Sequence, residues 1–159
     1  DWSSDVCSSD LFVSLPTAVA CDWHPLKRDR MLLIASADHP LATQETVDVA
    51  QLAEEPFIMP TVGCDNEIRR ILQAHKLEPK IKYELGDDHA IIAMAASGLG
   101  ISILPEMILF RLPPSIRAIP LEGDHYRTIG IAAASLDSLS PAAKRFFEQV
   151  QEWVSQSAD

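Results

Sequence analysis

Apolar residues follow two alternating periods in the middle of the chain, between Pro56 and Pro105. Short continuous apolar runs predict strands, whereas apolar residues three and four positions apart predict helices. The predicted order is strand 57–59, helix 65–75, strand 81–85, helix 88–97 and strand 101–104. Gly98 and Gly100 follow the second helix, as glycines commonly do at helix C-termini. Strands that alternate with helices predict an α/β fold with parallel strands and right-handed crossovers.

The flanking segments add further strands and one long amphipathic helix. Strands are predicted at residues 12–15, 23–37, 116–121 and 127–134, with short helices at 49–54 and 106–110. Ser140 and Pro141 open the last helix as its N-cap and first helical residue. The apolar face of this helix is predicted to lie in the core and consists of Phe146, Phe147, Val150, Trp153 and Val154.

Two turns of the central stretch are candidates for a ligand site. Ligands of open α/β sheets lie beyond the carboxyl ends of the strands, where the turns 60–65 and 86–88 are predicted. Each turn leads into a helix, whose first backbone N–H groups have no partner within the helix. Asp65 and Asp87 are typical N-cap residues, however, and spacing alone slightly favours the interpretation of both turns as simple connections with caps.

The amino-acid composition argues against several functional classes. The chain is 47% hydrophobic and 23% charged, as in ordinary globular proteins, and contains no apolar run of membrane-spanning length. A formal net charge of −10 argues against this chain binding nucleic acid by itself. Its three cysteines and five histidines lack metal-ligand spacing, and no nucleophile–base motif is present. We therefore expect no cofactor, no metal and no catalytic centre, and a reducing cytoplasm suits the cysteines best.

The first eleven residues, DWSSDVCSSDL, are rich in serine and aspartate and show no apolar periodicity. They resemble the translation of an oligonucleotide adapter used to prepare sequencing libraries. We therefore expect residues 1–11 to be foreign to the protein and to pack little against residues 12–154. On this interpretation the native N-terminus is missing, and Cys7 drops out of the cysteine count.

Five segments in this order resemble the effector-binding half of LysR-type transcriptional regulators. They are DRMLLIASADHPLA at 29–42, VAQLAEEPFIMP at 49–60, SGLGISILPE at 97–106, RTIGIA at 127–132 and SPAAKRFFEQV at 140–150. Together, the DHPLA turn and the GLGISILP run are a specific indication of this family, whereas either one alone is a weak indication. The resemblance extends over residues 12–154.

The resemblance implies a two-lobed, periplasmic-binding-protein-like α/β fold of type 2. Residues 12–36 and 125–159 would form a partial first lobe, and residues 37–124 a complete second lobe. The full-length protein would bind DNA only through an N-terminal winged helix-turn-helix that is absent here. It would form a homodimer or homotetramer in the cytoplasm, without membrane contact.

The family binds small-molecule effectors between its lobes, which implies a site for this chain. The implied residues are Pro60, Thr61, Val62, Gly63, Cys64, Gly86, Asp87 and Asp88 on the second lobe, with Ser14, Pro16 and Thr17 on the first. Acidic residues near the two helix starts leave the charge of the effector open. If these acidic side chains face the ligand, they disfavour an anionic effector. If they cap the helices, an anion site remains available.

Effector sensing has three alternatives. A peroxide-sensing branch of the family uses a cysteine near the position of Cys64 together with a second one shortly after it. The chain from Asp65 onward has no cysteine, which disfavours a disulfide switch. A solute-binding protein of a transport system shares the same fold and is the main alternative, since fold alone does not separate the two. A small α/β enzyme is disfavoured by the missing catalytic motifs.

Overall fold

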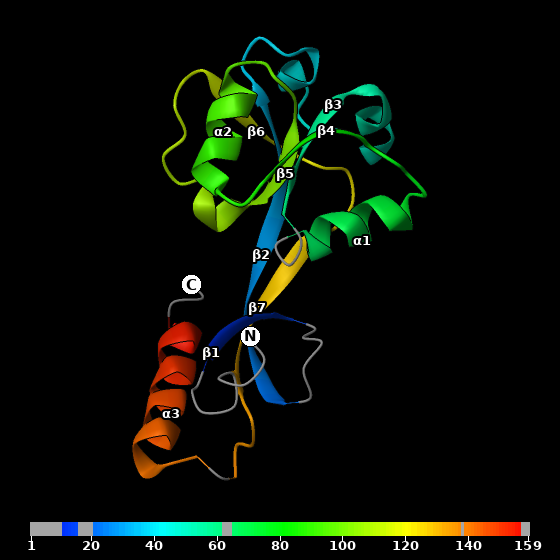
Figure 1. The fold of residues 1–159 in the computed structure, drawn as a ribbon. Helices are drawn as coiled ribbons and strands as arrows, with labels where there is room; N and C mark the ends of the chain where they lie inside the picture. Colours follow the sequence, from blue (N-terminus) through cyan, green and yellow to red (C-terminus); the bar gives the residue numbers. More distant parts are fainter. Residues whose placement is uncertain (1–10, 16–20, 62–64, 138, 157–159) are drawn as a thin grey trace. The chain divides into compact units, whose positions relative to one another are not determined.

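The computed structural model describes residues 11–15, 21–61, 65–137 and 139–156 (Figure 1). These residues form two compact units. The first unit contains the chain up to Asp29 and from Arg127 onward, and the second contains residues 30–126. Of the residues expected to be foreign, 1–10 lie outside the described part, and Leu11 begins a strand.

The second unit carries most of the regular structure. Its strands are the distal part of β2 (Asp22–Ser36), β3 (Pro56–Pro60), β4 (Lys80–Leu85), β5 (Ser102–Pro105) and β6 (Ile116–Pro120). Its helices are α1 (Asn66–Ala74), α2 (Asp88–Ala96) and three short 3₁₀ helices, η1 (Pro40–Thr43), η2 (Val49–Glu54) and η3 (Glu106–Ile108). These bounds agree with the predicted elements, except that the expected helix 106–110 is a shorter 3₁₀ turn.

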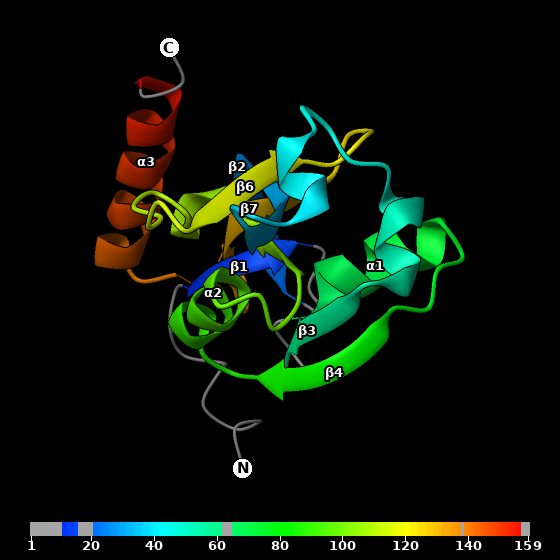
Figure 2. The same cartoon turned by 90° about the horizontal axis from the view of Figure 1, so that it is seen from above.

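Parallel and antiparallel pairing are combined in this unit. β3 and β4 are parallel, as predicted, and lie side by side in Figure 2. A parallel bridge between Phe57 and Ile101 joins β3 to the residue that precedes β5. β2 pairs antiparallel with both β5 and β6. The prediction of parallel strands therefore holds for the central stretch, and the antiparallel partner β2 comes from outside it.

β2 separates two hydrophobic cores because successive side chains of a strand point to opposite faces. Met31, Leu33 and Ala35 join one core, which α1 covers with Ile68, Ile71 and Leu72. Leu32 and Ile34 join the other core, which α2 covers with Ile91, Ile92 and Ala95. Complete burial of each leucine, isoleucine or methionine side chain contributes about 1.5–3 kcal/mol. The continuous apolar run at 31–35 thus reflects a strand buried on both faces.

Two glycines after α2 have separate roles. Gly98 has φ +73° and ends the helix in the left-handed conformation, as predicted. Gly100 lies where β5 approaches β3, and a Cβ at this position would be 2.5 Å from the Pro56 carbonyl oxygen. Gly100 is therefore required by the close approach of two backbones rather than by the helix end.

The first unit contains a small antiparallel sheet and one helix. β7 (Tyr126–Ala133) lies between β1 (Leu11–Leu15) and β2. In the same unit, the Nε and Nη2 atoms of Arg127 are each 2.9 Å from Oδ2 of the buried Asp29. α3 (Pro141–Gln156) begins as predicted, with the Ala143 N–H donating to Ser140 Oγ at 3.2 Å.

The predicted core face of α3 is largely exposed. Of its five apolar residues only Phe147 is buried, where its ring meets the ring of His24 edge-on at 6.2 Å. Phe146 and Trp153 are 45% and 69% exposed. The expectation of a buried stripe was wrong, because amphipathic spacing identifies the apolar face of a helix but not what covers it.

Candidate functional site

The two predicted turns meet at the carboxyl ends of β3 and β4. Pro60 is paired in register with Leu85, and the Thr61 N–H donates to the Leu85 carbonyl at 2.9 Å, so the ladder continues into the turn. A Cβ on Gly86 would lie 3.3 Å from Thr61 Oγ1. Pro60 is buried and Thr61 is exposed. The parallel register therefore brings the beginning of one turn against the beginning of the other.

Asp87 caps α2 as predicted. Its backbone is extended, and its Oδ1 accepts a hydrogen bond from the Ala90 N–H at 2.9 Å. Asp88 follows in the first helical turn with an exposed side chain. Both carboxylates complement the positive end of the helix dipole. One of the open N–H groups of α2 is consequently occupied by the protein itself.

Asp65 does not cap α1 with its side chain, contrary to prediction. It occupies the N-cap position and is 2% exposed, but no capping hydrogen bond from its carboxylate is found among the described residues. The carboxylate instead pairs with the Nε of Arg69, one helical turn further on. An i,i+4 arginine competes successfully here because its guanidinium forms a charge-assisted hydrogen bond. The negative charge of Asp65 is therefore compensated locally.

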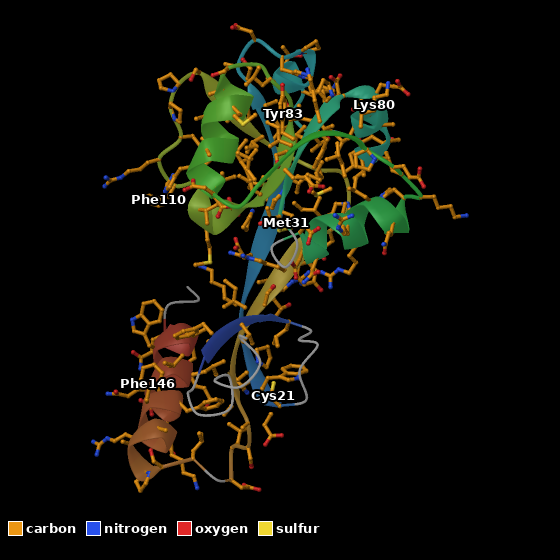
Figure 3. All side chains as sticks on the ribbon, viewed as in Figure 1. Cys21, Met31, Lys80, Tyr83, Phe110 and Phe146 are labelled. Atoms are coloured by element: carbon orange, nitrogen blue, oxygen red, sulfur yellow. The ribbon has the colours of Figure 1, made fainter. Side chains whose placement is uncertain are left out.

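A cavity of about 350 Å³ adjoins the start of α2. This volume lies within the range of small-molecule sites. Polar groups come from the start of α2, and apolar groups come from η3 and the residues after it. The lining residues are Gly86, Asp87, Asp88, His89, Ile92, Met107, Ile108 and Phe110, of which Phe110 is labelled in Figure 3.

Sequence reasoning missed the cavity residues that follow Asp88. His89 stands next to predicted residues and shares their helix start, so proximity in sequence was a usable signal. Met107 and Phe110 come from about twenty positions further along the chain, and nothing in their local pattern indicates that they face α2. Their exposed fractions, 48% and 78%, are large for apolar side chains.

Ser14 is not among the residues that line this cavity. Ser14 lies on β1 of the first unit, exposed and paired in register with Ile129. Val62, Gly63, Cys64, Pro16 and Thr17 lie outside the described residues. Their assignment to a site stays a prediction, as does any chemistry of Cys64.

In the described ranges, no group of three or more His, Cys, Asp or Glu side chains gathers in a metal-binding arrangement. Nor does any helix among these residues combine the length and apolarity needed to cross a bilayer.

Solved structures that share this fold include regulatory and effector-binding domains. The regulatory domain of Synechocystis CcmR in complex with 2-PG superposes with a TM-score of 0.82 at 24% identity, over 91% of this chain and 73% of that one. The effector-binding domain of QuiR in complex with shikimate gives 0.82 at 21% identity, over 92% and 72%. The BenM domain with benzoate gives 0.79 at 21% identity, over 93% and 70%. At these identities the likeness establishes the fold, a type 2 periplasmic-binding-protein-like architecture, as predicted.

Relatives in sequence are described as transcriptional regulators. The probable HTH-type regulator LrrA of Synechococcus elongatus is 31% identical over 87% of this chain and 47% of its own length. The uncharacterized HTH-type regulator YvbU of Bacillus subtilis is 30% identical over 90% and 50%. The chain thus spans about half the length of the curated relatives it matches.

Family membership follows from a match over nearly the whole chain. Residues 12–155 match the family described as LysR substrate binding domain, which covers both units and both predicted turns. The resemblance drawn from the DHPLA and GLGISILP segments is thereby confirmed. The chain belongs to the LysR substrate-binding domain family.

Proposed function

We propose that this chain is the effector-binding part of a LysR-type transcriptional regulator. We further propose that the meeting point of the two turns, at Thr61 and Gly86, holds one end of a small polar effector. The single observation that carries the site is the parallel register of β3 and β4, which brings Thr61 against Gly86. The HTH-type relatives favour a regulator over a transport solute-binding protein and over an enzyme.

The chemistry of the junction suits a ligand with hydrogen-bonding groups. Thr61 offers an exposed hydroxyl, and the start of α1 offers backbone N–H groups. Gly86 has no side chain, so a ligand can approach the backbone closely. Each well-formed hydrogen bond to a buried ligand contributes about 1 kcal/mol net, and more when the ligand is charged.

Charge distribution distinguishes the two helix starts. Asp65 is compensated by Arg69, whereas Asp87 and Asp88 place two carboxylates at the start of α2. An acceptor or anionic end of the effector therefore fits the α1 side better. A hydroxyl or amine of the effector fits the α2 side, where Asp88 lines the cavity. The named ligands of the fold neighbours, 2-PG, shikimate and benzoate, support a small-molecule effector.

The remaining functions of the regulator belong to parts outside this chain. A net charge of −10 opposes the phosphate backbone, so DNA binding is assigned to a separate domain. HTH-type relatives of about twice the length support that assignment. We place the complete regulator in the cytoplasm as a homodimer or homotetramer. Full-length BenM structures with the same fold support a multidomain regulator.

Thr61→Val tests the site without adding bulk. In the complete regulator, an effector found by thermal-shift screening of polar metabolites should bind this variant about fivefold more weakly by calorimetry, the value of one hydrogen bond. Thr46→Val is the matched control, because Thr46 is exposed elsewhere in the same unit. Equal affinities of the two variants would refute a role for the Thr61 hydroxyl.

A further inference from the structure

Two histidines of the second unit are in edge-to-face contact at the end of α1. His75 is the C-cap residue of α1, and His125 immediately precedes β7. Their ring centroids are 5.4 Å apart at an interplanar angle of 62°. His75 is exposed and His125 is half-buried, so solvent reaches this pair of rings. The two residues come from distant parts of the chain, which is why sequence spacing did not indicate a histidine pair.

One nitrogen of each ring is engaged by the backbone. His75 Nδ1 lies 3.0 Å from the Ile71 carbonyl oxygen. His125 Nε2 lies 2.8 Å from the Glu122 carbonyl oxygen. A carbonyl oxygen only accepts, so both of these nitrogens carry a proton and donate it. In the neutral rings, His75 Nε2 and His125 Nδ1 therefore carry lone pairs. Metal-binding histidines are usually oriented in this way, by a hydrogen bond from the nitrogen that does not bind the ion.

The separation of the two rings suits two ligands of one ion. Zn–N bonds of about 2.0–2.1 Å in a tetrahedral site place the centroids of two coordinating imidazoles about 5 Å apart. The observed separation of 5.4 Å therefore needs little adjustment. Two further contacts hold the backbone that carries the rings. Arg70 Nη2 on α1 donates to the Tyr126 carbonyl at 3.2 Å, and the Met31 N–H donates to the His125 carbonyl at 2.9 Å.

The residues next to the pair in sequence carry balanced charges. Glu122 and Asp124 flank His125, whereas Arg70 and Lys76 lie on the α1 side. The affinity for an ion must therefore come from the imidazole nitrogens rather than from net negative charge. Mg²⁺ and Ca²⁺ need several oxygen ligands, whereas imidazole suits Zn²⁺, Ni²⁺ and Cu²⁺. The chemistry of the pair thus selects transition-metal ions.

We propose that His75 Nε2 and His125 Nδ1 bind one divalent transition-metal ion of the class Zn²⁺, Ni²⁺ or Cu²⁺. Water completes the coordination, because no other described His, Cys, Asp or Glu side chain joins the pair. The ion links the end of α1 to residues 121–126, the segment through which the chain leaves the second unit. α1 is nine residues long, so the pair lies roughly 14 Å along the helix from its start. The metal site is therefore separate from the proposed effector junction at Thr61 and Gly86.

Zinc titration of the complete regulator, free of affinity tags and pretreated with a chelator, tests the site by calorimetry. His75→Gln and His125→Gln should each weaken Zn²⁺ binding by at least about tenfold, since even the loss of a ligand's hydrogen-bond partner costs about 10–100-fold. His89→Gln is the matched control, because His89 is an exposed histidine on α2, and it should leave the affinity unchanged. The alternative is a simple ring contact, which predicts no Zn²⁺ binding or equal binding by all four proteins. Either result would overturn the proposal.

Electron paramagnetic resonance with one equivalent of Cu²⁺ gives an independent readout. The wild-type spectrum should show hyperfine coupling to two imidazole nitrogens, and the spectrum of each single variant coupling to one. Coupling to a single nitrogen in the wild type would contradict a shared ion, and this result does not depend on how well a variant folds.

Thermal melts give a third readout. An ion that binds only the folded state stabilises it, so excess Zn²⁺ should raise the melting temperature of the wild type and of His89→Gln. It should leave His75→Gln and His125→Gln unchanged, and Mg²⁺ should affect none of them. Equal increases in all four proteins would contradict the site. These measurements use no effector, so they stand or fall separately from the proposed effector junction.

Discussion

The helices of the two units bury their apolar side chains to different extents. In the second unit, α1 and α2 are nine residues long, and each buries three apolar side chains against its own core. In the first unit, α3 is sixteen residues long and buries only Phe147. The second unit therefore contains the partners of its helices within the chain. The first unit displays an apolar face of α3 that the described residues leave largely uncovered.

The largest expected difference between the units concerns two phenylalanines. Phe57 is fully buried in the second unit, whereas Phe146 is 45% exposed in the first. In a chain of residues 12–159, Phe57→Ala should lower the free energy of unfolding by about 3–5 kcal/mol through cavity formation. Phe146→Ala should lower it by less than about 1 kcal/mol. Urea titration followed by circular dichroism measures both, and similar losses would abolish the distinction between the units.

Two glycines at close backbone approaches, one in each unit, should show smaller losses of stability that are similar in the two units. A Cβ on Gly100 would lie 2.5 Å from the Pro56 carbonyl oxygen in the second unit. A Cβ on Gly130 would lie 2.5 Å from Leu15 Cδ1 and 2.8 Å from the His24 carbonyl oxygen in the first. Each alanine variant should cost about 1–3 kcal/mol, since a backbone atom must move. Thermal melts of the two variants check this, and an unchanged midpoint for either would show that the sheet adjusts freely there.

Helix caps should give the smallest effects. Asp87 caps α2 and Ser140 caps α3 through side-chain oxygens. Alanine at either position should cost about 1 kcal/mol. Hydrogen exchange of the amides that lose their acceptor, Ala90 and Ala143, measures the two effects locally. If Ser140→Ala leaves exchange at Ala143 unaltered while Asp87→Ala accelerates it at Ala90, only the cap of the second unit contributes.

Local patterns predicted the elements well, because each depends on neighbouring residues. The apolar run 31–35 lies in a buried strand, and Gly98 adopts the left-handed conformation expected at a helix end. The side-chain cap expected from Asp65 was wrong, because Arg69 captures the carboxylate from the next helical turn. That competition depends on side-chain geometry, which residue type alone does not determine.

Features that depend on distant segments were not predictable. Met107 and Phe110 join the start of α2 only through the packing of η3. The open face of α3 was expected to be core, because its spacing resembles that of any buried helix. The resemblance to LysR regulators supplied the fold and the candidate site, which spacing alone left open.

Effector binding by a Gly86→Val variant of the complete regulator tests the central claim most directly. Valine would place its Cβ 3.3 Å from Thr61 Oγ1 and two methyl groups at the junction of the turns. Calorimetric titration should show at least tenfold weaker binding than wild type, about 1.4 kcal/mol, with a circular dichroism spectrum like that of the wild type. A folded variant that binds the effector with wild-type affinity would show that the two turns are connections only, and that the effector binds elsewhere.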